Sequence, residues 1–293
     1  MNEARRRLGL GGIGLCLIGT GFWAVALIVA PHLIMIDVSL RPALTLSEMG
    51  GPKDHWQLAN YLDLVLDPLS RGVFFKTIWA SILITLVSLA VCYPVAFYLA
   101  KLASGGALRV LMLLLIVPFW INEILRTFAW QLLLAQKGLI NAALLGLGLI
   151  PDPIAFTRGH TGVLIGMTYA YILFMVFPMY SAMESLDRNQ IEAARDLGAS
   201  WWRIHRCIVI PHAKPGIASG CIVTFMLAAG SFAVPQILGG VDSLWFTQLI
   251  YNRFNVSDWN QGAAYAVGLE ILCLLFVLAM MRLFRVGLSD IAR

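Results

Sequence analysis

The sequence predicts an all-α integral membrane protein that folds as one polytopic domain with six transmembrane helices. Composition is the first reason: of 293 residues, 59% are apolar and 13% are charged, with a mean hydropathy of +0.80. Soluble domains are about 45–50% apolar and about 25% charged. The second reason is a set of charge-free runs, each long enough for a bilayer crossing of about 20 residues. The third is that these runs lack strand alternation, so helices are the expected spanning structure.

The first predicted helix lies in residues 8–36, a run without formal charge that follows Arg5, Arg6 and Arg7. A cleaved signal peptide also has a basic start, but its apolar core is usually about 7–15 residues long and ends at a small-residue cleavage site. This run is longer and no such site closes it. We therefore expect an uncleaved anchor.

Five further segments complete the predicted set. Three of them carry no formal charge, while Glu123 and Arg126 interrupt one and Glu270 interrupts another. Within the single membrane domain (1–293), we expect a first helix with its outer loop in residues 1–70 and a helical core in residues 71–285. In chain order, the five segments are residues 77–100, 110–136, 161–183, 215–241 and 259–281.

Two connecting segments are long enough to contain helices of their own. Residues 39–76 carry several prolines and charges and predict a short interfacial helix near residues 56–66. Residues 138–159 begin with an apolar piece of about ten residues, which is too short to span and predicts a re-entrant or interfacial helix.

The distribution of lysine and arginine predicts the orientation, because basic residues near helix ends stay on the cytoplasmic side. With the N-terminus inside, most of the 21 basic residues fall in inner segments. Both termini are therefore expected in the cytoplasm.

Several functional classes are excluded by the residue pattern. The formal charge of +5 comes from scattered basic residues and not from a basic patch, which argues against nucleic-acid binding. The five cysteines and five histidines are isolated from one another, so no metal site, disulfide framework or nucleophile constellation is expected. The sequence contains no GxxxxGK[ST] phosphate loop, so we expect no ATP hydrolysis and no cofactor in this chain.

The most specific pattern lies in the predicted cytoplasmic loop, residues 184–214. Asn189 and Glu192 have the spacing of a capping box and predict a helix that starts at Asn189. Gly198 is able to adopt the left-handed conformation that ends helices.

A second helix is predicted over residues 201–210, with Ser200 as its cap and Pro211 as its end. The two helices together predict a compact elbow that protrudes from the membrane. We refer to residues 184–214 as the elbow.

Residues 192–211 resemble the signature loop of the inner-membrane permease subunits of ATP-binding-cassette importers. In that loop Glu-Ala-Ala, three residues, Gly, nine residues and Ile-x-Leu-Pro follow one another at fixed spacing. Ile210 is the one departure, in place of Leu. The matching positions are Glu192, Ala193, Ala194, Gly198, Ile208 and Pro211.

The resemblance implies the type 1 importer permease fold, in which the elbow is a coupling helix that docks on a separate ATPase. Gly198 and the two alanines would allow close approach, and Arg195 and Arg203 would pair with acidic groups of the ATPase. An ordinary cytoplasmic helical hairpin is the alternative interpretation.

Further segments resemble the spermidine/putrescine permeases in particular. Residues 118–134 with 138–141 are similar to their Pro-Phe/Ser-Trp, Arg-Thr/Val-x-Ala-Trp and Gly-x-Ile/Leu-Asn pattern, and residues 230–243 to their Phe-x-x-Pro-x-Leu-Leu-Gly-Gly stretch. The resemblance implies transport of a small amine-type solute such as a polyamine. The same branch also carries opines, amino-acid-like amines and aminophosphonates.

The resemblance also implies the partners and the location. A periplasmic substrate-binding protein would deliver the solute, a homologous second permease would complete the pathway in the bacterial inner membrane, and two ATPase subunits would hold ATP and Mg²⁺. An ion-coupled secondary transporter is the alternative, but it needs coupling carboxylates and usually repeated halves. Glu270 is the one suitably placed carboxylate in the sequence, and the sequence shows no internal repeat. A membrane-embedded enzyme would need a clustered polar site, which the sequence also lacks.

Charged residues within the spans are candidates for the solute pathway, because an ionisable group there costs about 2.5–3.5 kcal/mol and usually faces a cavity or a partner. Glu270, near the middle of its run, either offsets the lost hydration of a cationic amine or pairs with another helix. Glu123 and Arg126, spaced i,i+3, either form a structural ion pair or shape an outer gate, with Trp120 and Trp130 packed around it.

Overall fold

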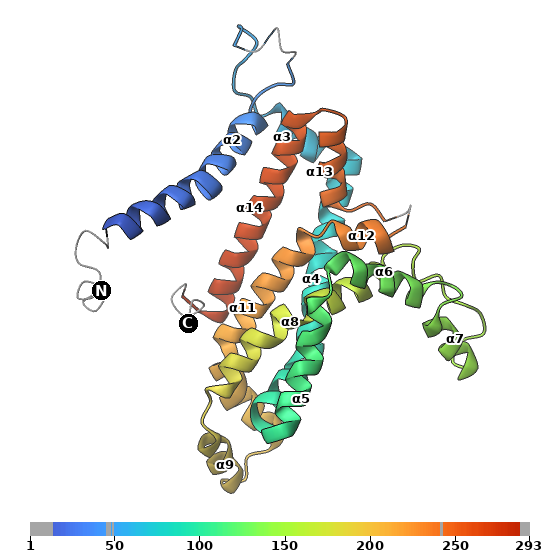
Figure 1. Ribbon diagram of the computed structural model, residues 1–293. Helices are drawn as coiled ribbons and strands as arrows, with labels where there is room; N and C mark the ends of the chain where they lie inside the picture. Colours follow the sequence, from blue (N-terminus) through green and yellow to red (C-terminus); the bar gives the residue numbers. More distant parts are fainter. Residues whose placement is uncertain (1–13, 45–47, 49, 241–242, 288–293) are drawn as a thin grey trace. The chain divides into compact units, whose positions relative to one another are not determined.

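A computed structural model describes residues 14–44, 48, 50–240 and 243–287, and every regular element in this part of the chain is helical (Figure 1). The chain divides into two compact units. The first comprises Met1–Pro68 and Ile250–Gly268, and the second comprises Leu69–Leu249 and Leu269–Arg293. The division into residues 1–70 and 71–285 stays a prediction. The basic residues that precede the expected anchor, Arg5, Arg6 and Arg7, lie outside the described residues.

Six helices in the described part of the chain are long and apolar enough to cross a membrane, which confirms the predicted number. A helix satisfies its own backbone hydrogen bonds, as hydrocarbon requires. The six are Gly14–Ser39, Pro68–Leu102, Glu123–Gly146, Thr161–Glu184, Trp201–Ala229 and Trp259–Phe284. The third of these is interrupted between Leu134 and Leu139.

The first unit contains the first span, the loop that follows it and residues 250–268. The span continues through the π turn η1 (Val25–Val29) into α2 (Ala30–Ser39), and the loop leads to α3 (Ala59–Leu66). This confirms a short helix near residues 56–66. Asn60 of α3 donates hydrogen bonds to the carbonyl oxygens of Ser39 and Arg41, at 2.8 and 2.9 Å. The loop is therefore tied to the end of α2.

Arg41 forms the main electrostatic contacts of this loop. Its Nε donates to Asp37 at 2.8 Å and its Nη1 donates to Asp54 at 2.6 Å. The backbone N–H of Gly50 also donates to Asp54, at 2.9 Å. The hydrogen bond from Gly50, followed by that from Arg41, lowers the pKa of the Asp54 carboxyl.

The second unit is built around α8 (Thr161–Glu184) and α11 (Ile210–Ala229), which cross closely (Figure 1). Gly216 permits this approach, because a Cβ there would overlap the carbonyl oxygen of Pro178 on α8. The other elements, in chain order, are α4 (Pro68–Phe97), η2 (Tyr98–Leu102), α5 (Gly105–Ile116), η3 (Val117–Trp120), α6 (Glu123–Leu134), α7 (Leu139–Gly146), α9 (Arg188–Asp196), α10 (Trp201–Ile204), η4 (His205–Val209), α12 (Ala233–Leu238), α13 (Phe246–Asn255) and α14 (Trp259–Phe284), of which the last two also enter the first unit.

Two apolar clusters fill the second unit at opposite ends of α8. One contains Met183 together with Ile191 of α9, and the other contains Met167 together with Leu238 of α12. Consequently α9 lies at one end of this unit and α12 at the other (Figure 1).

The predicted third span, residues 110–136, is wrong as a single helix. Pro118, which has no N–H to donate, lies in the 3₁₀ turn η3. Asn122 then starts α6 afresh, because its side chain accepts a hydrogen bond from the N–H of Ile124 at 2.8 Å. The apolar segment continues into α7, which confirms a short helix within residues 138–159. Its predicted re-entrant or interfacial position stays a prediction.

The predicted fifth span, residues 215–241, is displaced toward the N-terminus. The helix runs over Trp201–Ala229, and α12 is a separate element. Pro211 does not stop it, contrary to the prediction. In the preceding π turn η4 the N–H of Ile210 bonds to the carbonyl of His205, five residues back. Pro211 therefore falls in the first turn of α11, where its missing N–H costs little.

Candidate functional site

The elbow begins with a helix that is capped two residues earlier than the sequence predicted. Asp187 is the N-cap of α9, and its carboxylate accepts a hydrogen bond from the N–H of Asn189 at 2.9 Å. The predicted capping box from Asn189 to Glu192 is therefore wrong, because Asp187 already satisfies this N–H. Glu192 is exposed within α9.

Gly198 ends α9 as predicted. Its φ is +77°, its N–H donates to the carbonyl of Arg195 at 2.8 Å, and the N–H of Ala199 donates to that of Ala194 at 3.0 Å. These two bonds form the Schellman motif, in which a left-handed residue turns the chain and satisfies the last carbonyls of the helix.

One face of the elbow is packed into the second unit. Ile191 and Ile204 are 7% and 4% exposed and belong to the apolar cluster that also contains Met179 and Met183. Lys101, at the end of η2, donates hydrogen bonds to the carbonyl oxygens of Glu184 and Leu186. The buried side of α9 is therefore packed in one apolar cluster with side chains of α4 and α8.

The elbow also carries exposed apolar side chains that were not predicted from the sequence, and two of them are the most exposed. Leu197 is 89% exposed and Trp202 is 77% exposed. The predicted coupling residues Glu192, Ala193, Arg195, Gly198, Arg203 and Pro211 are also exposed, whereas Ala194 and Ile208 are half-buried. The signal that was available is the presence of three large apolar residues, Leu197, Trp201 and Trp202, beside the Gly198 turn.

A histidine links the elbow to α4. His205, in the π turn η4, is 3% exposed, and its Nδ1 lies 2.6 Å from the Tyr93 hydroxyl in a hydrogen bond. Its ring lies 4.0 Å from that of Trp201 and 4.4 Å from that of Phe97, centroid to centroid. His205 is thus held between α4 and Trp201 of the elbow.

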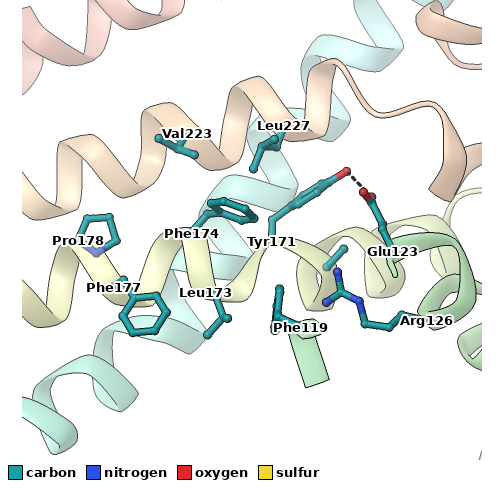
Figure 2. Close-up of a pocket in the computed structure, with 11 residues that line it drawn as sticks. Phe119, Glu123, Arg126, Tyr171, Leu173, Phe174, Phe177, Pro178, Val223 and Leu227 are labelled. Carbon is teal, nitrogen blue, oxygen red and sulfur yellow. Dashed lines mark hydrogen bonds between the residues drawn. The ribbon is translucent and has the colours of Figure 1, made fainter. Parts of the chain in front are cut away.

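A pocket of about 560 Å³ opens between η3, α6, α8 and α11 (Figure 2). Its wall is largely apolar and aromatic, with one carboxylate and one guanidinium. The lining residues are Phe119, Glu123, Arg126, Ala170, Tyr171, Leu173, Phe174, Phe177, Pro178, Val223 and Leu227.

The structure brings Glu123 and Arg126 to this pocket but does not pair them. The Tyr171 hydroxyl donates to Glu123 Oε1 at 3.3 Å, while the Arg126 guanidinium lies 4.2 Å from the centre of the Phe119 ring (Figure 2). Arg126 Nε and Nη1 are buried without a hydrogen-bond partner among the described residues. The structural ion pair considered from the sequence is therefore absent from this part of the chain, because neighbours outside the helix hold each side chain separately.

The other predicted pathway residues lie away from this pocket. Trp120 is 83% exposed, and Trp130 packs on Tyr169, 5.1 Å between ring centroids, where it lines a different pocket. Glu270 is exposed on α14. Their roles in a pathway stay predictions.

The aromatic residues of the pocket were not predicted from the sequence. Tyr171, Phe174 and Phe177 recur every three residues along α8, which places them near one face of the helix. That spacing was the available signal, but only the fold shows that this face meets Glu123.

Comparisons with known proteins place these features in a family. Residues 72–286 match the family described as "Binding-protein-dependent transport system inner membrane component". The chain is 38% identical over 275 residues to the spermidine/putrescine transport system permease protein PotB of Salmonella typhimurium (strain LT2), covering 92% of this chain and 94% of that protein. It is also 38% identical over 264 residues to PotB of Escherichia coli (strain K12), covering 90% and 94%.

A solved structure supports the fold. A chain of the bacterial alginate ABC transporter, in complex with an alginate pentasaccharide-bound periplasmic protein, superimposes with a TM-score of 0.77 at 16% identity. The alignment covers 98% of this chain and 99% of that chain.

Proposed function

This chain belongs to the family of binding-protein-dependent transport system inner membrane components, and from that premise we propose that it is the permease subunit of an ATP-driven bacterial importer of small amine-type solutes such as polyamines. The elbow is the observation that carries the proposal. It combines a buried face that is packed on the membrane helices with an exposed face that offers Leu197 and Trp202 to a partner.

The proposed partners follow from this arrangement. Two ATPase subunits bind ATP and Mg²⁺, and one of them docks on the exposed face of the elbow. A homologous second permease completes the pathway, and a periplasmic binding protein delivers the solute, in line with the alginate transporter, which was solved in complex with its pentasaccharide-bound periplasmic protein. Both termini and the elbow face the cytoplasm, as the basic residues indicate.

The solute class is supported by two independent features. The PotB relatives are named for spermidine and putrescine transport. In this chain, the pocket presents the Glu123 carboxylate beside aromatic rings, and both are groups that attract ammonium ions. Opines, amino-acid-like amines and aminophosphonates are competitors in the experiment below.

Expression of the complete transporter in a strain that lacks its own polyamine importers tests the proposal. We expect copurification of this chain with an ATPase and vanadate-sensitive uptake of labelled spermidine or putrescine. Uptake that the isolated chain drives from an ion gradient in vesicles would refute the importer. Uptake of a competitor solute in place of both polyamines would refute the solute class alone.

A further inference from the structure

The pocket contains a carboxylate and a guanidinium one helical turn apart that do not pair (Figure 2). We propose that Glu123 binds an ammonium group of the transported amine and that Arg126 is a tethered competitor for Glu123. In the binding state, the Arg126 guanidinium packs on the Phe119 ring and Glu123 is accessible to the ammonium. In the release state, the Arg126 side chain changes rotamer, pairs with the Glu123 carboxylate and displaces the ammonium. The inference rests on the proposed function and adds to it a binding residue and a means of release.

Glu123 is positioned to receive a cation. Its side chain is half-buried and accepts a hydrogen bond from the Tyr171 hydroxyl. Tyr171 is 5% exposed, so its surroundings hold it in place. A carboxylate has about four acceptor positions, so one hydrogen bond leaves capacity for an ammonium donor. Phe174 and Phe177 extend the pocket wall with ring faces that attract cations and pack against methylene chains.

The hydrogen bonding of Arg126 is incomplete in its present position, which favours a change of rotamer. Two of its nitrogens are buried without an acceptor among the described residues, and such unsatisfied donors are costly. Glu123 is the nearest acidic residue along α6, at the i,i+3 spacing at which side chains of a helix meet. The Phe119 ring stabilises the unpaired position, since its face attracts the guanidinium.

The two positions of Arg126 give the site opposite affinities for a cation. With Arg126 on Phe119, no basic side chain of the described residues forms an ion pair with Glu123, so the ammonium meets a negatively charged carboxylate. With Arg126 on Glu123, the carboxylate is neutralised and the ammonium is released. A shift of this one side chain thus converts binding into release without a charged residue from another helix.

Binding and transport by the complete transporter test the inference. The complex is placed in lipid nanodiscs without the periplasmic protein, bound spermidine is measured by equilibrium dialysis, and the uptake rate is measured in liposomes with that protein present. Copurification of the ATPase establishes that each variant assembles. Asp152→Asn and Arg158→Gln, which change residues outside the pocket, are the matched controls.

We expect Glu123→Gln to weaken spermidine binding by about ten- to a hundredfold, as the loss of a charge-assisted hydrogen bond predicts. Arg126→Gln tightens binding but slows uptake, because release is impaired. Phe119→Leu weakens binding, because Arg126 then rests on Glu123, and the double variant Phe119→Leu with Arg126→Gln recovers the affinity of Arg126→Gln.

Three results overturn the inference: unchanged binding in Glu123→Gln, weaker binding in Arg126→Gln, or no recovery in the double variant. The second of these indicates that Arg126 holds an anionic group of the solute. If the wild-type complex neither binds nor imports spermidine or putrescine, the proposed solute class fails and this site fails with it. A competent wild type with an unaffected Glu123→Gln variant overturns the site alone.

Discussion

Substitution of Gly198 tests whether the backbone turn of the elbow is needed for coupling to an ATPase. Gly198 has a φ of +77°, and a Cβ at this position would meet no atom of the chain within 4 Å. The expected effect of Gly198→Ala is therefore backbone strain without a clash. The same substitution at Gly106, which is exposed in α5 with open space around it and without a positive φ, is the matched control.

The size of the effect follows from two competing costs. An alanine kept in the left-handed conformation costs roughly 1–2 kcal/mol. Abandoning the turn instead loses two hydrogen bonds, of 2.8 and 3.0 Å, at about 0.5–1.5 kcal/mol each. We therefore expect Gly198→Ala to reduce the population of the native elbow by about 5- to 30-fold. Gly198→Asn is expected to destabilise the elbow less than Gly198→Ala, since asparagine tolerates the left-handed conformation. Gly198→Asp introduces a side chain of the same size as asparagine together with a negative charge.

The assay is ATPase copurification from membranes, followed by solute-stimulated ATP hydrolysis. Membrane insertion is expected to be normal in all variants, with ATPase recovery decreasing from Gly106→Ala to Gly198→Asn, Gly198→Ala and Gly198→Asp. Normal ATPase recovery and normal uptake in both Gly198→Ala and Gly198→Asp would refute the reasoning. Equal losses of ATPase recovery in Gly198→Asn and Gly198→Ala would show that the ATPase requires a position without a side chain, and that the backbone conformation is not the cause of the loss.

Three further predictions follow from the elbow, its link to α4 and the first unit. Leu197→Ser and Trp202→Ala are each expected to weaken ATPase binding at least tenfold, as truncation of an interface anchor does, while expression is unchanged; wild-type affinity in both, measured by titration, would place the ATPase elsewhere. His205→Ala removes a buried hydrogen bond to Tyr93. This loss is expected to lower the free energy of unfolding of the purified complex by about 1–3 kcal/mol, measured by thermal denaturation, and to reduce the number of solute molecules transported per ATP hydrolysed. An unchanged number of solute molecules per ATP argues against a coupling role for His205. Because the folded pKa of Asp54 is lowered, its contacts stabilise the loop above the ordinary aspartate pKa of about 4 and lose this effect as pH falls through the folded value; proteolysis of the loop is therefore expected to accelerate in acid, and the same acid profile in Asp54→Asn would contradict this assignment.

The sequence by itself determined the class of fold and the position of the elbow. Long apolar runs predict spanning helices because hydrocarbon leaves the backbone no alternative. The helix Thr161–Glu184 and the helix Trp259–Phe284 accordingly lie within a few residues of the predicted segments. Gly198 was identifiable for a similarly local reason, because its neighbours need the left-handed turn that glycine adopts most readily.

Only the tertiary structure decided features that depend on competition between neighbours. The break at Asn122 and the passage of Pro211 into α11 result from caps and a π turn whose hydrogen bonds form within the folded helices. Glu123 and Arg126 have the spacing of a pair, yet Tyr171 on another helix holds the carboxylate and Phe119 holds the guanidinium. Sequence spacing limits which contacts a side chain is able to reach, but the free energies of all the partners that the fold brings near decide which contact it makes.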